Sequence, residues 1–373
     1  MSEQVYKDLA QHLDSLPNGF PATESGVELR ILKRLFTPEE AAMALHLRLK
    51  FDTAEALAER AGAEPAAAAE LLQQMARKGL AFSIEAPGKP SRYMVAQFVV
   101  GMWEYHVGEL DEQFARDMRE YTPHLTKEAF DKLPQLRTIP VGKSIVGNTN
   151  VMPYEQAEAL IENAARFAVA PCICRKEHKL TGAGCDKLFE ACLVFDVGAD
   201  YYLRNGIARE IDKAECLEIL KKADEQGLVV QPGNTQNLVN ICLCCGCCCQ
   251  ALLAMKRHPK PAEVAASAYF AQVDQDACIA CGLCVERCQM EAIKVDDYAA
   301  VDLDRCIGCG LCVSTCPTEA MTLARKPDHD TPYVPKNTSE AFGLRHHLRK
   351  QGGGIEEALA ALQEKAARHK ATK

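Results

Sequence analysis

The sequence lacks the marks of a membrane or exported protein. No run approaches the roughly 18 consecutive apolar residues of a membrane helix. The first residues, Met1 to Val5, have neither the basic nor the apolar region of a signal peptide. The glycine motifs that bind nucleotide phosphates are missing, and no Ser-His-Asp pattern is present. These absences predict a soluble, cytoplasmic protein and give no support to nucleotide binding or hydrolysis.

Cysteine, by contrast, is abundant. The 373 residues include 19 cysteines, concentrated in clusters after residue 171. The count is odd and no export signal accompanies it, so metal ligation explains the clustering better than disulfides do. The length suits two or three domains, because larger single cores are rare.

Two copies of one cysteine string stand 28 residues apart near the C-terminus, each with the spacing Cys-x-x-Cys-x-x-Cys-x-x-x-Cys. Three thiolates at this spacing on a glycine-containing loop can reach three irons of a cubane, while the fourth points to another cluster. The flanking residues repeat with one difference, Ala280 in the first copy and Gly308 in the second. A duplicated half with approximate two-fold symmetry is implied.

Residues 272–325 resemble the bacterial two-cluster ferredoxins, which implies two [4Fe–4S] clusters with crossed ligation. Gln289 departs from that family, which has proline after the fourth cysteine, and restores an N–H donor there. Two zinc sites would also need four ligands each, but they give no reason for this tandem spacing. The ligands expected are Cys278, Cys281, Cys284 and Cys316 for the first cluster, and Cys306, Cys309, Cys312 and Cys288 for the second.

This segment is acidic, with nine carboxylates against four bases between Val273 and Arg325, in a chain whose formal net charge is −8. A negative surface suits docking on a redox partner with a basic surface, because the field speeds the encounter. Plain solubility is the alternative explanation. Exposed low-potential cubanes oxidise easily, which predicts an anaerobic host.

A second concentration of cysteine lies in residues 153–258, where six of the eight positions from 242 to 249 are cysteine. Packing gives no reason for so many thiols, so we expect a soft metal, either a third [4Fe–4S] cluster or zinc. Cys216 is set apart, because it falls on a helix between Asp212 and Gly227 and should pack as a small apolar residue. The favoured ligands are Cys172, Cys185 and Cys192 with one or more of Cys244, Cys245, Cys247 and Cys248.

The local pattern suggests how these cysteines are presented. We expect a helix over 154–168, which Pro171 ends before a ligand-bearing loop, in a mostly helical domain. In an extended segment, alternation sends Cys242 and Cys244 to one face, while Gly246 breaks the run and lets the next thiols turn back. The strings Pro-Cys-Ile-Cys-Arg and Ile-Cys-Leu-Cys-Cys-Gly-Cys-Cys-Cys ahead of the ferredoxin segment resemble a group of iron–sulfur proteins from anaerobic bacteria. That resemblance implies electron transfer in cytoplasmic redox complexes.

Residues 26–100 predict three helices and a β-ribbon, the plan of a winged helix. Thr53 and Gly62 bound one helix, and the next runs from Pro65 to Gly79. This last helix is alanine-rich and nearly neutral, whereas a DNA-reading helix offers arginine, lysine or amides to bases and phosphates. We therefore expect a structural or docking role rather than DNA recognition. The single tryptophan, Trp103, should be a core or interface residue.

The predicted fold is multidomain α+β, with a C-terminal pseudo-two-fold ferredoxin domain of βαβ repeats. The segments expected are an N-terminal helix or arm (1–25), a winged-helix-like domain (26–100), a helical linker region (101–152), a cysteine-rich domain (153–258), the ferredoxin domain (272–325), and an extended arm with a C-terminal helix (326–373).

These features predict an electron-transfer protein that passes electrons through two [4Fe–4S] clusters, with a third metal centre, to or from a partner oxidoreductase. We expect a non-catalytic carrier or an oxidoreductase subunit. Two alternatives stay open: a redox-sensing winged-helix regulator, and an enzyme with an open-site cluster in the middle domain. The sequence leaves the partner, the direction of flow, the cluster potentials and the oligomeric state open.

Overall fold

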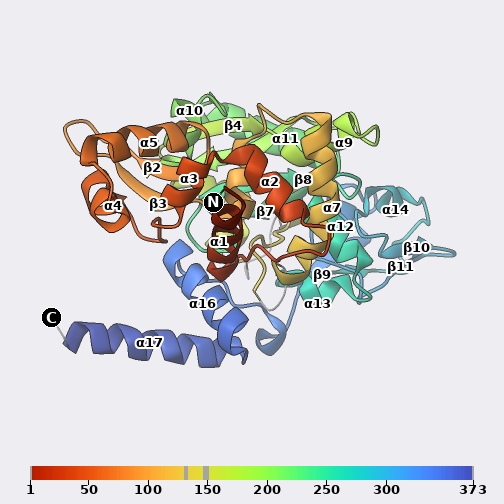
Figure 1. The fold of residues 1–373 in the computed structure, drawn as a ribbon. Helices are drawn as coiled ribbons and strands as arrows, with labels where there is room; N and C mark the ends of the chain where they lie inside the picture. The colour runs from red at the N-terminus through yellow and green to blue at the C-terminus, as the bar shows by residue number, and fades with distance from the viewer. Residues whose placement is uncertain (1, 130–132, 146–150, 372–373) are drawn as a thin grey trace.

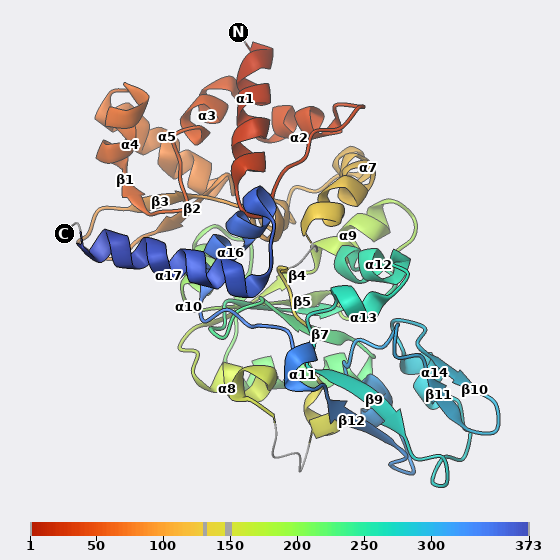
Figure 2. The ribbon, with the colours of Figure 1, turned by 90° about the horizontal axis from the view of Figure 1, so that it is seen from below.

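The computed structural model describes residues 2–129, 133–145 and 151–371, so part of the expected linker, 146–150, lies outside the described residues. The described chain is a mixed α/β structure with small antiparallel sheets. Figure 2 places the N-terminal helices at one end of the molecule and strands β9 to β12 at the other, with a central sheet between them.

The N-terminal region is helical, with one small sheet. Thr53 caps α4 by accepting a hydrogen bond from the Ala56 N–H, and Gly62 ends that helix at φ 64°, as the sequence predicts. The expected ribbon is present, although the winged-helix assignment stays a prediction. The elements are α1 (Ser2–Ser15), α2 (Val27–Leu35), α3 (Pro38–Ala44), β1 (Asp52–Thr53), α4 (Ala54–Ala61), α5 (Pro65–Arg77), β2 (Ala81–Ile84) and β3 (Arg92–Val95), with sheet order β1-β3-β2.

The segment after this sheet joins the same hydrophobic core. It contains a π-helical turn η1 (Phe98–Met102), α6 (Trp103–Tyr105) and α7 (Glu112–Ala129). Trp103 is buried and packs edge-on against Phe114, with ring centroids 5.2 Å apart, so the expectation of a core residue is confirmed.

The middle of the chain is built on a five-stranded antiparallel sheet of order β6-β4-β5-β8-β7. This corrects the expected helix over 154–168 and the expected mostly helical domain: the helix α8 covers only Ala157–Glu162, and the residues after it form a strand. Pairing with β5 and β6 holds that strand, and local pattern does not report such long-range pairing. The strands are β4 (Phe167–Pro171), β5 (Glu190–Phe195), β6 (Arg209–Glu210), β7 (Val229–Pro232) and β8 (Asn240–Cys244).

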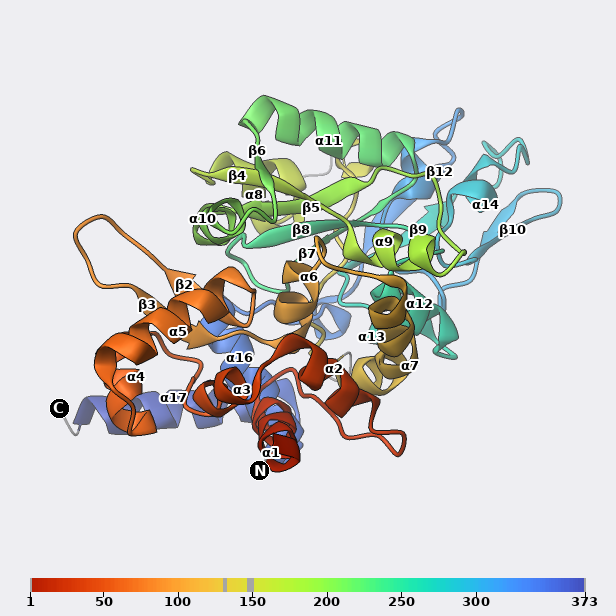
Figure 3. The same cartoon turned by 45° about the horizontal axis from the view of Figure 1, so that its top comes forward.

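Helices cover both sides of this sheet, and Figure 3 shows α11 on one side with α6 and α7 on the other. Asp212 caps α11 as expected, and Cys216 is fully buried in the hydrophobic core, which confirms its packing role. The helices are α9 (Ile173–Leu180), α10 (Asp196–Arg204), α11 (Lys213–Glu225), α12 (Gln250–Arg257) and α13 (Pro261–Val264), with short 3-10 turns η2 (Gly142–Ile145) and η3 (Pro153–Glu155) before α8.

The next segment repeats itself in three dimensions. Backbone positions with positive φ recur 28 residues apart, at Ala280 and Gly308 and again at Glu291 and Glu319. Strands β9 and β12 pair with each other, as do β10 and β11. The elements are β9 (Tyr269–Val273), α14 (Leu283–Arg287), β10 (Ile293–Val295), β11 (Ala299–Val301), α15 (Leu311–Ser314) and β12 (Met321–Arg325).

The C-terminal segment returns to the N-terminal region. After a short 3-10 turn η4 (Asp328–Asp330) it forms two helices, α16 (Thr338–Gln351) and α17 (Ile355–Ala371), where the sequence predicted one. Arg349 donates to the carbonyl oxygens of Asp14 and Leu16, both at 2.7 Å, so α16 packs against the end of α1 (Figure 1). Among the described residues, no helix is both long and apolar enough to cross a membrane.

Candidate metal centres

In each cysteine string the first two cysteines lie on a loop before α14 or α15, the third lies in the helix, and the fourth follows it. Backbone N–H groups point at their sulfurs: Ala271 donates to Cys306 Sγ at 3.4 Å, and Ala299 donates to Cys278 Sγ at the same distance. These two bonds are related by the internal repeat, and each runs from one half to the other. N–H groups directed at thiolates are the surroundings expected of cluster ligands.

The fourth cysteine of the first string lies beside the second string. Burial raises the pKa of Cys309 to about 12, and charge on Cys288 adds to that shift. Burial likewise raises the pKa of Cys306, with Cys288 contributing again. Cys288 therefore lies near Cys306 and Cys309, while Cys316 receives N–H bonds from its own half that lower its pKa against the effect of burial.

The two loops differ sharply in exposure despite their common sequence. Ile279 is 63% exposed, whereas its counterpart Ile307 is 2% exposed. Leu283 is 40% exposed, whereas Leu311 is fully buried. Residues before and within η2 cover the second loop, since the Val141 N–H donates to the Cys309 carbonyl at 3.0 Å. The first string faces solvent, and the second faces the rest of the protein.

A compact group of four thiols, here called the outer group, lies between the α9–β5 connection and the loop after β8. Cys185, Cys245, Cys247 and Cys248 have all their Sγ atoms within 4.8 Å of one another. Cys248 Sγ lies 3.6 Å from Cys185 Sγ and 3.7 Å from Cys247 Sγ, and Cys185 Sγ lies 3.9 Å from Cys245 Sγ. Burial acts to raise the pKa of Cys185, but hydrogen bonds from the backbone and neighbouring thiols lower it to about 7.

Gln289 connects the outer group to the ferredoxin-like segment. Its Oε1 accepts a hydrogen bond from the Gly246 N–H at 2.7 Å, inside the cysteine run. A Cβ on Gly246 would lie 2.6 Å from the Gln289 carbonyl oxygen, so the close approach requires glycine. The side chain that departs from the family pattern thus holds the outer-group loop next to Cys288.

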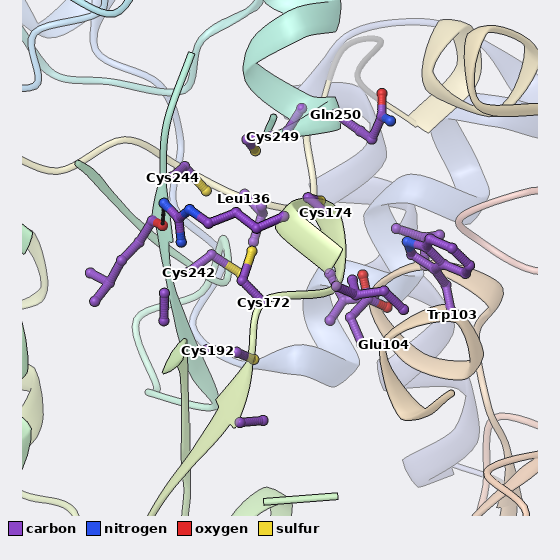
Figure 4. A pocket seen from close by; sticks show the side chains of 18 of the residues that line it. Trp103, Glu104, Leu136, Cys172, Cys174, Cys192, Cys242, Cys244, Cys249 and Gln250 are labelled. Atoms are coloured by element: carbon purple, nitrogen blue, oxygen red, sulfur yellow. Dashed lines mark hydrogen bonds between the residues drawn. The ribbon is translucent and has the colours of Figure 1, made fainter. Parts of the chain in front are cut away.

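Six further cysteines, here called the inner group, border a cavity of about 100 Å³ between the central sheet and α6, α7 and α12. Cys192 on β5 is paired directly with Cys242 on β8. Figure 4 shows the thiols gathered on one side of the cavity and Trp103 and Glu104 on another. The inner group consists of Cys172, Cys174, Cys192, Cys242, Cys244 and Cys249.

The inner thiols affect one another's ionisation. Bonds from Cys192 and Cys244 lower the pKa of Cys242. Bonds from Cys174 and Cys244 lower the pKa of Cys249 in the same way. A bond from Cys174 also lowers the pKa of Cys172. Three of the six therefore favour the thiolate form, which is the form that binds metals.

A buried cation and a half-buried carboxyl border this cavity. Arg175 is 1% exposed, and its terminal nitrogens donate to the carbonyls of Leu188 at 2.7 Å and Leu243 at 2.9 Å. Burial acts to lower the pKa of Arg175, but nearby thiolates of both groups raise it overall. Burial raises the pKa of Glu104 to about 8, so this carboxyl is protonated at neutral pH.

The structure divides the seven middle-domain candidates between the two groups. Alternation along β8 does direct Cys242 and Cys244 to one cavity, and the chain turns back at Gly246. The favoured ligand set omitted Cys174, Cys242 and Cys249, although the pairing of Cys242 with Cys244 on one strand face was a usable signal for one of them. The candidates Cys172, Cys192 and Cys244 lie in the inner group, and Cys185, Cys245, Cys247 and Cys248 form the outer group.

The comparisons with known proteins bear on the repeated segment. Residues 271–323 match the family model of the 4Fe-4S dicluster domain. No curated protein and no solved structure matches the chain. The chain therefore carries an iron–sulfur domain, and its cysteine clusters are those of a metal-binding protein.

Proposed function

We propose that this protein transfers electrons through two [4Fe–4S] clusters to or from a partner oxidoreductase. The dicluster match and the repeated loops support the cofactors. The unequal exposure of the two loops supports different roles for the two clusters. A cluster held by Cys278, Cys281, Cys284 and Cys316 lies at the surface and meets the partner, while a cluster held by Cys306, Cys309, Cys312 and Cys288 faces inward.

The surface around the exposed loop fits a redox partner with a basic face. Ile279, Leu283 and Val285 expose apolar side chains on it, and Val285 is 41% exposed. Exposed carboxylates surround these residues, among them Asp276 and Glu286. An apolar centre within an acidic rim supplies buried contact area and long-range attraction at once.

The outer group fits zinc, and we propose that it ties the middle domain to the ferredoxin segment. Four thiolates about 2.3 Å from one zinc ion stand roughly 3.8 Å apart at the corners of a tetrahedron. The distances of 3.6, 3.7 and 3.9 Å in this group agree with that geometry. A cubane distributes its thiolates over separate irons and holds them further apart. Among the described residues, the ferredoxin cysteines form no group as compact as this one.

Regulation through DNA has weaker physical support. At the end of α5, Lys78 pairs with Glu40 at 2.6 Å, which occupies a charge that a phosphate contact would need. We therefore keep electron transfer as the function and assign the N-terminal region a structural or docking role.

The test uses the full chain, purified without oxygen, and a basic one-electron acceptor protein such as cytochrome c. We expect cluster EPR signals after reduction with dithionite, and electron transfer that slows as salt rises. Cys281→Ser should slow transfer while the inward cluster remains, and Cys216→Ser should change neither signal nor rate. Absence of iron and sulfide would refute the proposal, as would transfer at wild-type rate in Cys281→Ser.

A further inference from the structure

The inner group contains more thiols than one ordinary metal site uses. A zinc ion or a single cubane takes four protein ligands, whereas the six inner cysteines border one cavity, which Cys245 of the outer group also lines. We propose that the inner group holds a polynuclear iron–sulfur cluster, a metal centre separate from the outer group and from the two ferredoxin clusters.

The first support is that six cysteines from distant parts of the chain converge on one cavity. The six cysteines come from four places in the chain: the start of α9, strand β5, strand β8 and the residue before α12. Folding brings Cys172 and Cys249 to one cavity although 77 positions separate them. The cavity of about 100 Å³ exceeds the roughly 30 Å³ that one water occupies, so it has room for several metal and sulfide atoms.

Ordinary packing does not explain this arrangement. Cys216 illustrates a thiol that packs as a small apolar side chain, since burial alone raises its pKa to about 12. The inner thiols instead line one cavity together, and none of them is in a disulfide. Thiols that converge on one cavity are placed to bind a metal cluster together as thiolates.

The second support is an uncompensated charge. Arg175 is permanently positive and 1% exposed, and its Nε has no hydrogen-bond partner among the described residues. Two backbone carbonyls alone do not balance a buried guanidinium, which therefore favours negative charge on the sulfur atoms around it. An anionic iron–sulfur–thiolate cluster beside it supplies the missing negative charge.

The inner and outer groups are distinct although consecutive residues contribute to them. Cys244 and Cys245 both line the cavity, but only the Cys245 Sγ lies among the compact sulfurs of the outer group. The outer sulfurs are compact, whereas no three inner sulfurs of the described chain come within 4.8 Å of one another. One metal ion therefore fits the outer group, and a larger inorganic core fits the inner one.

The experiment counts iron, sulfide and zinc per chain in the full-length protein purified without oxygen. Two [4Fe–4S] clusters account for about eight irons, so we expect clearly more than eight, together with about one zinc. The double variant Cys192→Ser and Cys242→Ser should lose only the iron above eight and should keep the zinc. Cys247→Ser should lose the zinc and keep the iron, and Cys216→Ser, a buried cysteine of the same domain, should lose neither.

The wild-type count decides the matter even if a variant fails to fold. About eight irons with working electron transfer would overturn this inference and leave the proposed function intact. Zinc instead of iron above the eight would also overturn it. If the wild-type protein lacked these eight irons, the result would instead count against the ferredoxin clusters. Mössbauer spectra of the wild type provide the second measurement, because iron in excess should give a component that disappears in the double variant.

Discussion

Ala280 and Gly308 occupy equivalent positions in the two halves of the repeat. Adding a methyl group at Gly308 and removing one at Ala280 should change the free energy of unfolding in opposite directions. Both have positive φ, 54° and 65°. A non-glycine residue in this region costs about 1–2 kcal/mol. A Cβ at Gly308 would in addition collide with the Tyr269 carbonyl oxygen and lie 2.8 Å from Ser267 Oγ. Such crowding adds about 1–3 kcal/mol, so Gly308→Ala should destabilise the folded protein by about 2–5 kcal/mol.

Ala280→Gly removes strain of about 1–2 kcal/mol, offset by about 0.5–1 kcal/mol of glycine chain entropy. Its net effect should lie between zero and about 1.5 kcal/mol of stabilisation.

The assay is thermal loss of the clusters' visible absorbance, recorded without oxygen. At about 2–4 °C per kcal/mol, Gly308→Ala should lower the midpoint by roughly 5–20 °C, and Ala280→Gly should leave it unchanged or raise it slightly. Equal shifts in the two variants would refute the argument that the β9 carbonyl makes the two halves different. A Gly308→Ala protein with an unchanged midpoint would refute the steric argument itself.

Three further predictions concern docking and packing. Ile279→Ser should weaken binding to a basic redox partner by roughly 5–30-fold, from about 1–2 kcal/mol of lost apolar burial. Val197→Ser, another exposed apolar side chain on α10, is the control, and an equal loss there in a binding titration would contradict the docking surface. Arg287→Ala removes the cationic partner that lies 2.9 Å from Asp224, which then keeps its bond from the Ser314 hydroxyl. The change should destabilise the folded protein by about 3–5 kcal/mol and speed proteolysis between α11 and α14, and an unchanged proteolysis rate would contradict this. Leu193→Ala, at a fully buried site, should cost about 2–5 kcal/mol in thermal unfolding; a change below 1 kcal/mol would mean that the sheet relaxes.

Local chemistry explains why parts of the protein could be predicted. Ligand spacing within each string is set by the reach of neighbouring thiolates around a cluster, so the iron–sulfur segment was evident from the sequence. The starts of two helices could be predicted for the same reason, because the side chains of Thr53 and Asp212 accept hydrogen bonds from N–H groups only three residues away. Cys216 was correctly assigned to packing, because helical periodicity alone places it.

Other features depended on contacts between distant residues. The expected helix ran to 168, into the first two residues of β4, because the pairing partners that hold this strand lie 19 or more positions onward. The acceptor role of Gln289 required its encounter with Gly246, 43 positions earlier.

The sequence by itself determined that thiolates bind metal here and that one segment is an iron–sulfur repeat, because those properties reside in short spacings. Only the tertiary structure decided which string is covered and how the middle cysteines divide between two groups. The physical reason is that burial and the meeting of Cys172 with Cys249 arise from long-range packing of the sheet and helices, which no local pattern encodes.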